Sequence, residues 1–431
     1  MVRVLAVADS DSYLKWSAAV LAGLPPGWSA EQVVLTSPIT PSLAQIHAAT
    51  SRPVWVLGYV HLAWKILRDK PDVLLLGCTG PVVRAILAIP YLRHGRRRPV
   101  LVTGLPGISV PVKPRGIAHR SECDLLIVHS HREREEFDAY GRALAPGMLL
   151  GLARLPFLSR GNPVRAGTEP ACERPVVFAA QAQVPPDREA RRSLLLELAE
   201  AAGSQPIVVK LRASAGQQQT HRELWPYPDL WAELVAEGKV AEAALRFSTG
   251  AMSAALDAAA GLVTVSSTAA LEAIAADIPV VILSDFGVSA EMINLVFEQS
   301  GCLGTLDDVR QRRFFSPDPG WLRSNYFHPA EDSDWLELMQ RLLAQRHATG
   351  LSDRPIRGTG LPAERVRQQL RLALPPRAWA ALASLRRSWR RVRTTSRASR
   401  GQGRRALARL RARRLEPAPA EPPHAPVDVH H

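Results

Sequence analysis

The sequence predicts an α/β protein made of two doubly wound parallel-sheet domains and a basic, helical C-terminal tail. Three observations predict this fold. Short apolar segments alternate with helical patterns over most of the chain, as in parallel sheets covered by helices on both faces. This alternation stops over residues 156–174 and then restarts. The excess positive charge lies near the C-terminus. At 431 residues, the chain is also too long for a single typical core.

The first half of the chain is predicted to form one sheet. We expect strands at residues 3–8, 32–36, 72–76, 99–103, 124–129 and 148–151. Helical patterns occupy residues 13–24, 53–68, 81–93 and 132–140. The strands are apolar along their length rather than alternating, which is typical of a sheet buried on both faces.

The second half repeats this organisation. We expect strands at residues 176–180, 207–211, 245–248, 262–265 and 280–283. Helices are predicted at 187–202, 230–236, 253–260, 268–276 and 290–299, and a last one at 335–346 after the strand signal ends near residue 308. The halves predict two Rossmann-like domains that face each other across a cleft, where the carboxyl ends of the strands meet the ligand.

These patterns predict five regions. Residues 1–155 form the first domain, and residues 156–174, rich in proline, glycine and charge, form a linker. Residues 175–307 form the second domain, 308–375 a crossing segment with helices, and 376–431 the tail.

The tail contains the whole charge excess. Fourteen arginines and no acidic residue lie between Arg377 and Arg414; without them, 40 Lys and Arg balance 40 Asp and Glu. Tryptophans and leucines at helical spacing predict an amphipathic basic helix, which favours an anionic membrane surface as partner through residues 377–414 and disfavours nucleic acid. The alternative is a disordered, solvated tail.

Cysteine usage and apolar segments predict a cytoplasmic protein, peripheral at the inner face of the membrane if the tail binds lipid. The four cysteines show neither Cys-x-x-Cys spacing nor nearby histidines, which disfavours a zinc site and a disulfide framework. The apolar run before Asp9 is too short for a signal peptide, and no stretch reaches the roughly 20 residues of a membrane span.

The segment from Gly261 to Leu283, GLVTVSSTAALEAIAADIPVVIL, is the most informative motif. A buried strand leads into Ser266-Ser267-Thr268 at the start of a helix, where free N–H groups and hydroxyls can bind phosphate. Alternatively, Ser267 or Thr268 only caps the helix. A capping box would need an acidic or amide residue three positions after the cap, and Glu272 does not occupy that position.

This segment resembles the nucleotide-binding half of GT-B glycosyltransferases, most closely the capsule, sialic-acid and glycerophosphate transferases. The N-terminal AVADSDSYLKW resembles an uncharacterised actinobacterial family of "putative glycosyltransferases". The resemblance spans roughly residues 1 to 330, and its motifs are short. It implies a GT-B fold and a nucleotide-sugar donor held by Ser266, Ser267, Thr268 and Glu272.

The same resemblance implies a basic strand end upstream, and the segment IVVKLRASAGQQQTHRE provides Lys210, Arg212, His221 and Glu223. Lysine and arginine at this place could neutralise a donor phosphate. The related transferases have His-Pro directly after the basic residue, whereas His221 follows about 10 residues later. A solvated strand end with an ordinary loop histidine is the alternative.

The first domain is expected to present the acceptor. The strand ends are rich in glycine, which lets a backbone approach a ligand, and His129 and His131 flank the predicted cap Ser130. The residues expected on this rim are Lys15, Thr79, Gly80, Gly104, Gly107, His129 and His131.

Asp9-Ser-Asp11 follows the first strand and allows more than one interpretation. A metal-binding Asp-x-Asp belongs to a different, single-domain transferase architecture, so we expect no metal here. Asp11 or Asp9 is instead the candidate base that deprotonates the acceptor hydroxyl, while Ser10 or Asp11 could cap the following helix.

We therefore expect a metal-independent glycosyltransferase without a cofactor, using a nucleotide-sugar as co-substrate and a glycan or lipid-linked acceptor of the cell envelope or capsule. A nucleotide-sugar 2-epimerase of the same fold is one alternative, and a non-catalytic protein that binds membrane or nucleic acid through its tail is another. The sequence has no Gly-x-Gly-x-x-Gly after the first strand, no Walker lysine loop and no Gly-x-Ser-x-Gly, which disfavours dehydrogenases, kinases and hydrolases.

Overall fold

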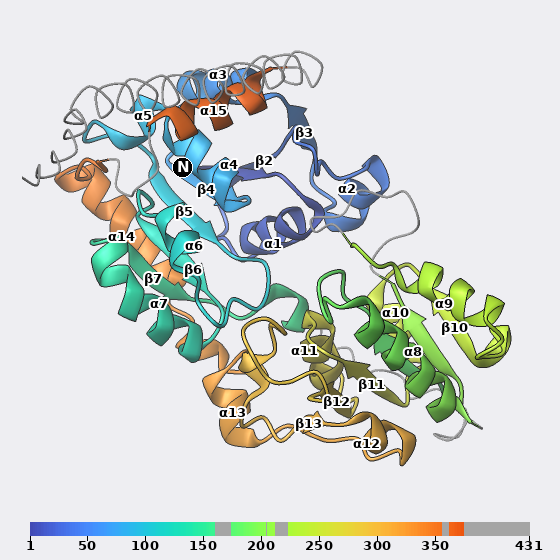
Figure 1. Cartoon of the computed structure of the whole chain (residues 1–431). Helices are drawn as coiled ribbons and strands as arrows, with labels where there is room; N and C mark the ends of the chain where they lie inside the picture. The colour runs from blue at the N-terminus through green and yellow to red at the C-terminus, as the bar shows by residue number, and fades with distance from the viewer. Residues whose placement is uncertain (160–173, 204, 212–222, 356–361, 375–431) are drawn as a thin grey trace, which may run out of the picture. The chain divides into compact units, whose positions relative to one another are not determined.

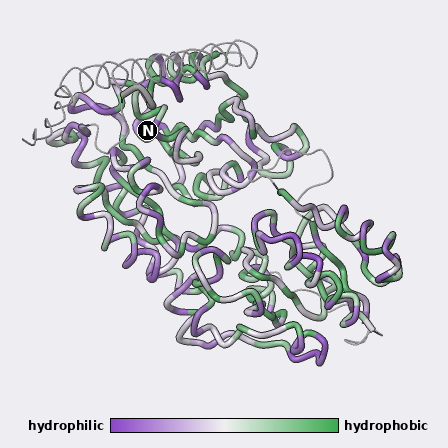
Figure 2. The backbone as a smooth tube through the Cα atoms, in the orientation of Figure 1, coloured by the Kyte–Doolittle hydropathy of each residue, from purple (hydrophilic) through white to green (hydrophobic). Residues whose placement is uncertain are grey.

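The computed structural model describes residues 1–159, 174–203, 205–211, 223–355 and 362–374. It contains two sheets in which every paired strand is parallel. Hydrophobic residues concentrate along these strands (Figure 2). The predicted tail and most of the predicted linker lie outside the described residues, as do Arg212 and His221.

The N-terminal sheet has seven strands in the order β3-β2-β1-β4-β5-β6-β7 (Figure 1). Its strands are β1 (Arg3–Ala8), β2 (Ser29–Leu35), β3 (Val54–Leu57), β4 (Val73–Gly77), β5 (Val100–Gly104), β6 (Leu125–Val128) and β7 (Leu149–Leu152). The chain changes direction across the sheet between β1 and β4. In doubly wound sheets, this switch point is where ligands bind, beyond the carboxyl ends of the strands.

Helices cover both faces of this sheet. On one face α1 (Asp11–Ala22) and α14 (Trp335–Ala348) pack on β1, β4, β5 and β6. On the other lie α3 (Tyr59–Asp69), α4 (Gly80–Leu87) and α15 (Pro362–Ala373). The remaining helices are α2 (Leu43–Ala49), α5 (Pro90–Arg93), α6 (Pro114–Ala118) and α7 (His131–Leu144). The predicted helix 335–346 is thus α14, and it packs on the N-terminal sheet.

The C-terminal sheet has six strands in the order β10-β9-β8-β11-β12-β13. They are β8 (Val176–Ala179), β9 (Ile207–Lys210), β10 (Leu245–Ser248), β11 (Gly261–Thr264), β12 (Val280–Leu283) and β13 (Leu303–Gly304). One face is covered by α8 (Arg188–Ala202), α9 (Tyr227–Ala236) and α12 (Leu306–Arg310). The other packs against α11 (Thr268–Ala275) and α13 (Pro319–Ser324), and α10 (Met252–Asp257) precedes β11. The switch point lies between β8 and β11.

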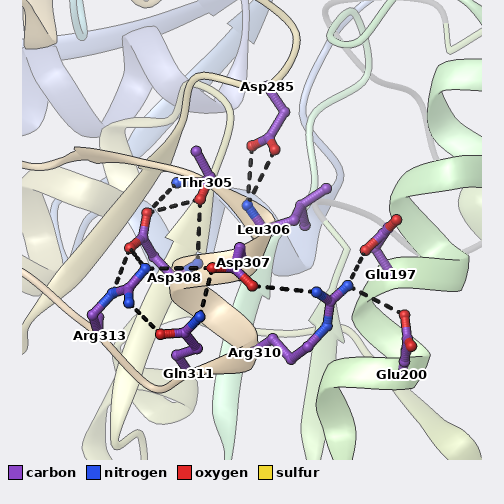
Figure 3. Close-up of polar contacts among 10 residues, drawn as sticks. All are labelled: Glu197, Glu200, Asp285, Thr305, Leu306, Asp307, Asp308, Arg310, Gln311 and Arg313. Carbon is purple, nitrogen blue, oxygen red and sulfur yellow. Dashed lines mark hydrogen bonds and ion pairs between the residues drawn. The ribbon is translucent and has the colours of Figure 1, made fainter.

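Polar contacts fix the short helix α12 at the edge of this sheet (Figure 3). Thr305 and Asp308 form a capping box, and the Asp285 carboxylate accepts a hydrogen bond from the Leu306 amide at 3.1 Å. Arg310 then forms ion pairs with Glu197 and Glu200 of α8. These exposed pairs orient α12, although each pair alone stabilises little, about 0–1 kcal/mol.

The structure differs from the prediction in several elements. The segment predicted as helix 53–68 begins with strand β3, and α3 starts only after its N-cap, Gly58. The predicted helix 290–299 is wrong, because turns and a single 3-10 turn, Leu295–Phe297, occupy this segment. The two-residue strand β13 was not expected. Within the described parts of the chain, no helix is both long and apolar enough to cross a membrane.

Candidate functional site

Asp9 and Thr79 meet at the switch point of the N-terminal sheet. Asp9 follows β1 and Thr79 follows β4, and these two strands are neighbours. Asp9 Oδ2 accepts hydrogen bonds from the Thr79 amide at 3.0 Å and from the Thr79 hydroxyl. The other oxygen, Oδ1, is buried without a hydrogen-bond partner in the described chain. Thr79 therefore holds one carboxylate oxygen, and the other oxygen is unpaired in the described chain.

Burial raises the pKa of the Asp9 carboxyl above its ordinary value of 3.8. The hydrogen bonds from Thr79 and the charge of Arg120 act in the opposite direction, but burial is the larger effect. Arg120 is itself buried and donates to the Tyr13 hydroxyl at 2.9 Å and to the Cys78 carbonyl at 3.0 Å. A positioned carboxylate with a raised pKa is suited to accept a proton near neutral pH.

Asp11 is less suited to that role. Its Oδ2 pairs with Lys15 at 2.8 Å, one turn along α1, while Oδ1 has no partner. Lys15 is therefore the counterion of Asp11 and is mostly exposed. Ser10 occupies the N-cap position of α1, but its side chain makes no capping hydrogen bond. Of the two predicted caps, only the position of Ser10 is confirmed.

A cavity of about 330 Å³ lies beside Asp9. Its walls include Thr79 and the side chains of four arginines and one histidine, namely Arg84, Arg115, His119, Arg367 and Arg371. Two nitrogens of the Arg84 guanidinium, Nε and Nη2, are buried without a hydrogen-bond partner. Asp9 is the only acidic residue that lines this cavity among the described residues. Positive charge in this setting favours an anionic ligand.

The glycines predicted on this rim serve mainly close packing. A Cβ atom on Gly80 would lie 2.2 Å from His119 Nδ1, and one on Gly104 would lie 2.2 Å from Trp16 Cζ2. Their neighbours are protein side chains, so close packing by itself requires glycine at both positions. Gly107 differs, because a Cβ there would lie 3.0 Å from Thr268 Cγ2, next to the start of α11.

The two predicted histidines have different surroundings. The His129 ring is buried; its Nδ1 contacts the Ala153 carbonyl at 2.9 Å, and its Nε2 accepts a hydrogen bond from Trp16 Nε1 at 2.9 Å. Burial lowers the pKa of His129, because the charged form of the ring would lose its hydration. His129 is therefore not an exposed base but part of the core. His131 begins α7 and contacts Asp332 Oδ2 at 2.8 Å.

At the switch point of the C-terminal sheet, Ser266-Ser267-Thr268 connects β11 to α11. The Ser267 hydroxyl accepts a hydrogen bond from the Ala269 amide at 3.1 Å, so Ser267 is the N-cap. The Ser266 hydroxyl donates to the Ile293 carbonyl at 2.6 Å. Thr268 has no such bond to the described chain and lies beside Gly107. Two of the three predicted phosphate hydroxyls are thus already used within the fold.

Lys210 ends β9 and is only 2% exposed. Its Nζ donates to the Gly250 carbonyl at 2.8 Å, and burial lowers the pKa of the amine. Within the described residues, no carboxylate lies close enough to Nζ for an ion pair. Lys210 is therefore a buried cation that has carbonyl contacts but no described counterion.

Glu272 lies on α11, half-buried, and interacts with another residue. Glu272 does not take part in capping α11, because the N-cap Ser267 accepts its hydrogen bond from the Ala269 amide.

Arg191, beside the loop that follows β8, is a residue that the sequence interpretation missed, as it missed the arginines that line the cavity beside Asp9. It is buried in α8 and donates to the Pro185 carbonyl at 2.7 Å and the Ala182 carbonyl at 2.8 Å, which fixes the loop after β8. It also pairs with Glu223 at 2.7 Å. Glu223, expected near the donor, is therefore the partner of a buried arginine. A basic residue at the start of a helix after a strand gives no sequence signal for such a role.

A family model described as "Putative glycosyltransferase (DUF6716)" matches residues 4–342. The chain belongs to this family. Membership agrees with the predicted glycosyltransferase class, while the actinobacterial and capsule-type relationships stay interpretations. A search of curated proteins finds no match.

Solved structures with the same fold include a UDP-GlcNAc 2-epimerase and a protein in complex with UDP. The enzyme from Methanocaldococcus jannaschii is 12% identical, with a TM-score of 0.51 over 80% of this chain and 99% of its own. The S. aureus MnaA–UDP complex is 10% identical, with a TM-score of 0.50 over 83% of this chain and 100% of its own. At such identities the likeness concerns the fold, and it confirms the predicted pair of Rossmann-like domains in a GT-B arrangement.

Proposed function

We propose that the protein transfers a sugar from a nucleotide-activated donor to a hydroxyl group of an anionic, cell-envelope or capsule-type acceptor. Family membership supports the class of reaction. The observation that carries the proposal is the open Oδ1 of Asp9, a buried carboxylate of raised pKa beside a cavity at the switch point of the N-terminal sheet.

Asp9 acts as the general base in this proposal. The acceptor hydroxyl attacks the anomeric carbon of the donor and its proton passes to Asp9 Oδ1. The bond from that carbon to the phosphate oxygen of the donor breaks, and the nucleotide leaves with the bonding electrons. Thr79 donates two hydrogen bonds to Oδ2. These bonds fix the carboxylate and leave Oδ1 to accept the proton. General-base catalysis by a positioned carboxylate contributes about 100- to 10,000-fold.

The donor phosphates bind at the start of α11 and beside Lys210. The helix begins with N–H groups and a positive dipole end, and Ser267 fixes its first turn. Lys210 supplies the positive charge for the departing nucleotide, so that the donor site needs no metal ion and no cofactor. Gly107 supports this arrangement, because a Cβ atom there would lie 3.0 Å from Thr268 Cγ2, so this loop of the N-terminal domain lies close to the start of α11. Arg212, His221 and Glu272 complete the donor site in this proposal.

The acceptor carries a phosphate or carboxylate in this proposal. Arg84, Arg115, Arg367 and Arg371 line the cavity beside Asp9, and Arg84 has two buried nitrogens that need an acceptor. A lipid-linked glycan phosphate has this chemistry. The arginine-rich segment 377–414 would then hold the protein at the anionic inner face of the membrane that carries such an acceptor.

The test is a thermal-shift panel with UDP-, GDP-, CMP- and CDP-linked sugars. A donor should raise the Tm of the wild type, and the shift should fall in Lys210→Met, since that variant removes the phosphate charge but keeps the aliphatic chain. Lys239→Met is the matched control, because Lys239 is exposed and pairs with Glu237. The absence of a shift with every donor would refute the proposal.

A nucleotide-sugar 2-epimerase is the second candidate, supported by the epimerase named in the M. jannaschii structure, which shares the fold. Incubation with UDP-GlcNAc separates the two reactions. Formation of the 2-epimer without an acceptor would favour the epimerase, whereas turnover that requires an acceptor favours the transferase. A non-catalytic binding protein would show neither.

A further inference from the structure

His131, His328 and Asp332 form a cluster that the donor and acceptor sites do not use. His131 begins α7, while His328 and Asp332 belong to the segment between α13 and α14. One ligand atom of each residue lies within 4.8 Å of the corresponding atoms of the other two. The cluster joins residues that are about 200 positions apart in the chain.

His328 has an unusual hydrogen-bonding state. The side chain is 1% exposed, and its Nδ1 lies 3.0 Å from the Pro329 carbonyl. A carbonyl oxygen can only accept, so Nδ1 carries the proton and Nε2 presents a lone pair. That Nε2 is buried and has no hydrogen-bond partner in the described chain. A metal-binding histidine has this same arrangement, in which a backbone carbonyl fixes the ring that presents the other nitrogen to the ion.

The neighbouring groups supply the remaining ligands. His131 Nε2 lies 2.8 Å from Asp332 Oδ2, and the rings of His131 and His328 are 5.5 Å apart between centroids. Ligand atoms around a tetrahedral Zn²⁺ ion lie about 3.3 Å apart, given zinc bonds of about 2.0 to 2.2 Å. The present spacing, from 2.8 Å to at most 4.8 Å, spans this value. Small side-chain movements would therefore bring three ligands around one ion.

We infer that His131, His328 and Asp332 bind a divalent transition-metal ion of the Zn²⁺ class, with a fourth position open to water. Two imidazoles and one carboxylate favour Zn²⁺, Co²⁺ or Ni²⁺ over Mg²⁺ or Ca²⁺, which prefer oxygen ligands alone.

The position suggests a structural role for the ion. It would connect α7, which covers the N-terminal sheet, to the segment that leads back from the C-terminal domain into α14. Arg134 and Asp334 already form an ion pair nearby, and the Asp334 carboxylate accepts a hydrogen bond from the Leu152 amide at 2.7 Å. The ion would add a second link at this crossing, separate from the donor site, which the proposal leaves metal-free.

The test is equilibrium dialysis of the full-length protein against Zn²⁺, followed by elemental analysis. Because His424, His430 and His431 near the chain's end could bind zinc by themselves, all three are first changed to alanine. We expect one Zn²⁺ ion per chain in this background. His328→Ala and Asp332→Asn should each lose the ion. Asp332→Asn is the milder change, because Asn can still accept the hydrogen bond from His131.

His94→Ala is the matched control. His94 and Asp353 form an exposed pair at 3.3 Å without a third ligand, so this variant should keep the ion. Zn²⁺ should also raise the Tm of the background protein and of His94→Ala but not of Asp332→Asn, since only a site present in the folded state stabilises on binding. Bound Co²⁺ should show the intense visible absorption of a four-coordinate site. Equal zinc content in Asp332→Asn and His94→Ala, or no bound zinc in the background protein, would overturn the inference.

Discussion

At the switch point of the N-terminal sheet, three buried side-chain oxygens have no partner in the described chain, those of Asp9 Oδ1, Ser10 Oγ and Asp11 Oδ1. At the switch point of the C-terminal sheet, the hydroxyls of Ser266 and Ser267 are both hydrogen-bonded within the fold. Buried polar groups are nearly always paired in proteins, so three unpaired oxygens together point to a ligand.

This difference indicates that the two sheet edges contribute differently to the reaction. The C-terminal edge offers a capped helix start and the cation of Lys210, which in the proposed function bind the charge of the donor phosphates without side-chain chemistry. The N-terminal edge offers a carboxylate whose proton affinity is raised. We therefore expect substitutions at the N-terminal edge to change the rate of the reaction and those at the C-terminal edge to change donor affinity.

The largest effect is expected from Asp9→Asn. Asn can accept the hydrogen bond from the Thr79 amide but cannot take a proton, so kcat should fall about 100- to 10,000-fold, while the donor-induced Tm shift should persist. The measurement is transfer with the donor identified by the thermal-shift panel. Asp138→Asn is the matched control, because Asp138 pairs with Arg142 one turn along α7 and both side chains are exposed. Equal losses in both variants would contradict the role of Asp9.

The next effect concerns Lys210→Met. A charge-assisted hydrogen bond to phosphate contributes about 1.5–3 kcal/mol, so donor affinity should fall about 10- to 100-fold. The unliganded protein should lose little stability, because the loss of the hydrogen bond to the Gly250 carbonyl is offset by the removal of a charge that burial disfavours. Calorimetric titration with the donor measures the affinity. A large drop in kcat with unchanged donor affinity would reverse the proposed division between the two edges.

The pH dependence of stability tests the burial of Asp9 directly. Because the pKa of the folded carboxyl is raised above 3.8, the folded state holds the proton more tightly than the unfolded state. Stability from this group is therefore present at low pH and is lost as the pH rises from 3.8 through the raised pKa. The asparagine of Asp9→Asn cannot ionise. The Tm of this variant should therefore rise relative to the Tm of the wild type as the pH increases across this window. Parallel Tm curves for the two proteins would show that burial does not raise the pKa.

The fold could be largely predicted because its signals are local. The buried strands and the helix starts follow apolar runs and breaking residues, and β1, β10 and β12 have the predicted bounds. The strand β3 was hidden because Val54–Leu57 runs into α3 as a single apolar stretch, with only Gly58 between them. Over residues 290–299, the Asn294 side chain bonds to the Ser289 amide and the Gly287 carbonyl, which competes with a helix.

The site could be predicted less well because its contacts join distant residues. Asp9 was a candidate from its position after β1, but its partner Thr79 lies 70 residues away. The burial of His129 against Trp16 and the pairing of Glu223 with Arg191 depend in the same way on packing between elements. Residue type and spacing therefore identify the strand ends, whereas packing decides which side chains at those ends are open.

The smallest effect is expected from Ser267→Ala. Removing the N-cap of α11 should lower the free energy of unfolding by about 1 kcal/mol. Donor affinity should change by only about threefold or less, because the phosphate meets backbone N–H groups and Lys210 rather than the Ser267 hydroxyl, which the Ala269 amide already uses. Chemical denaturation and donor titration on the same variant separate the two quantities.

Ser267→Gly should keep most of the stability, since glycine is tolerated at N-caps. A loss of donor affinity in both variants that exceeds the loss of stability would mean that the hydroxyl leaves its cap to bind the donor, and the C-terminal edge would then resemble the N-terminal edge in using side-chain chemistry.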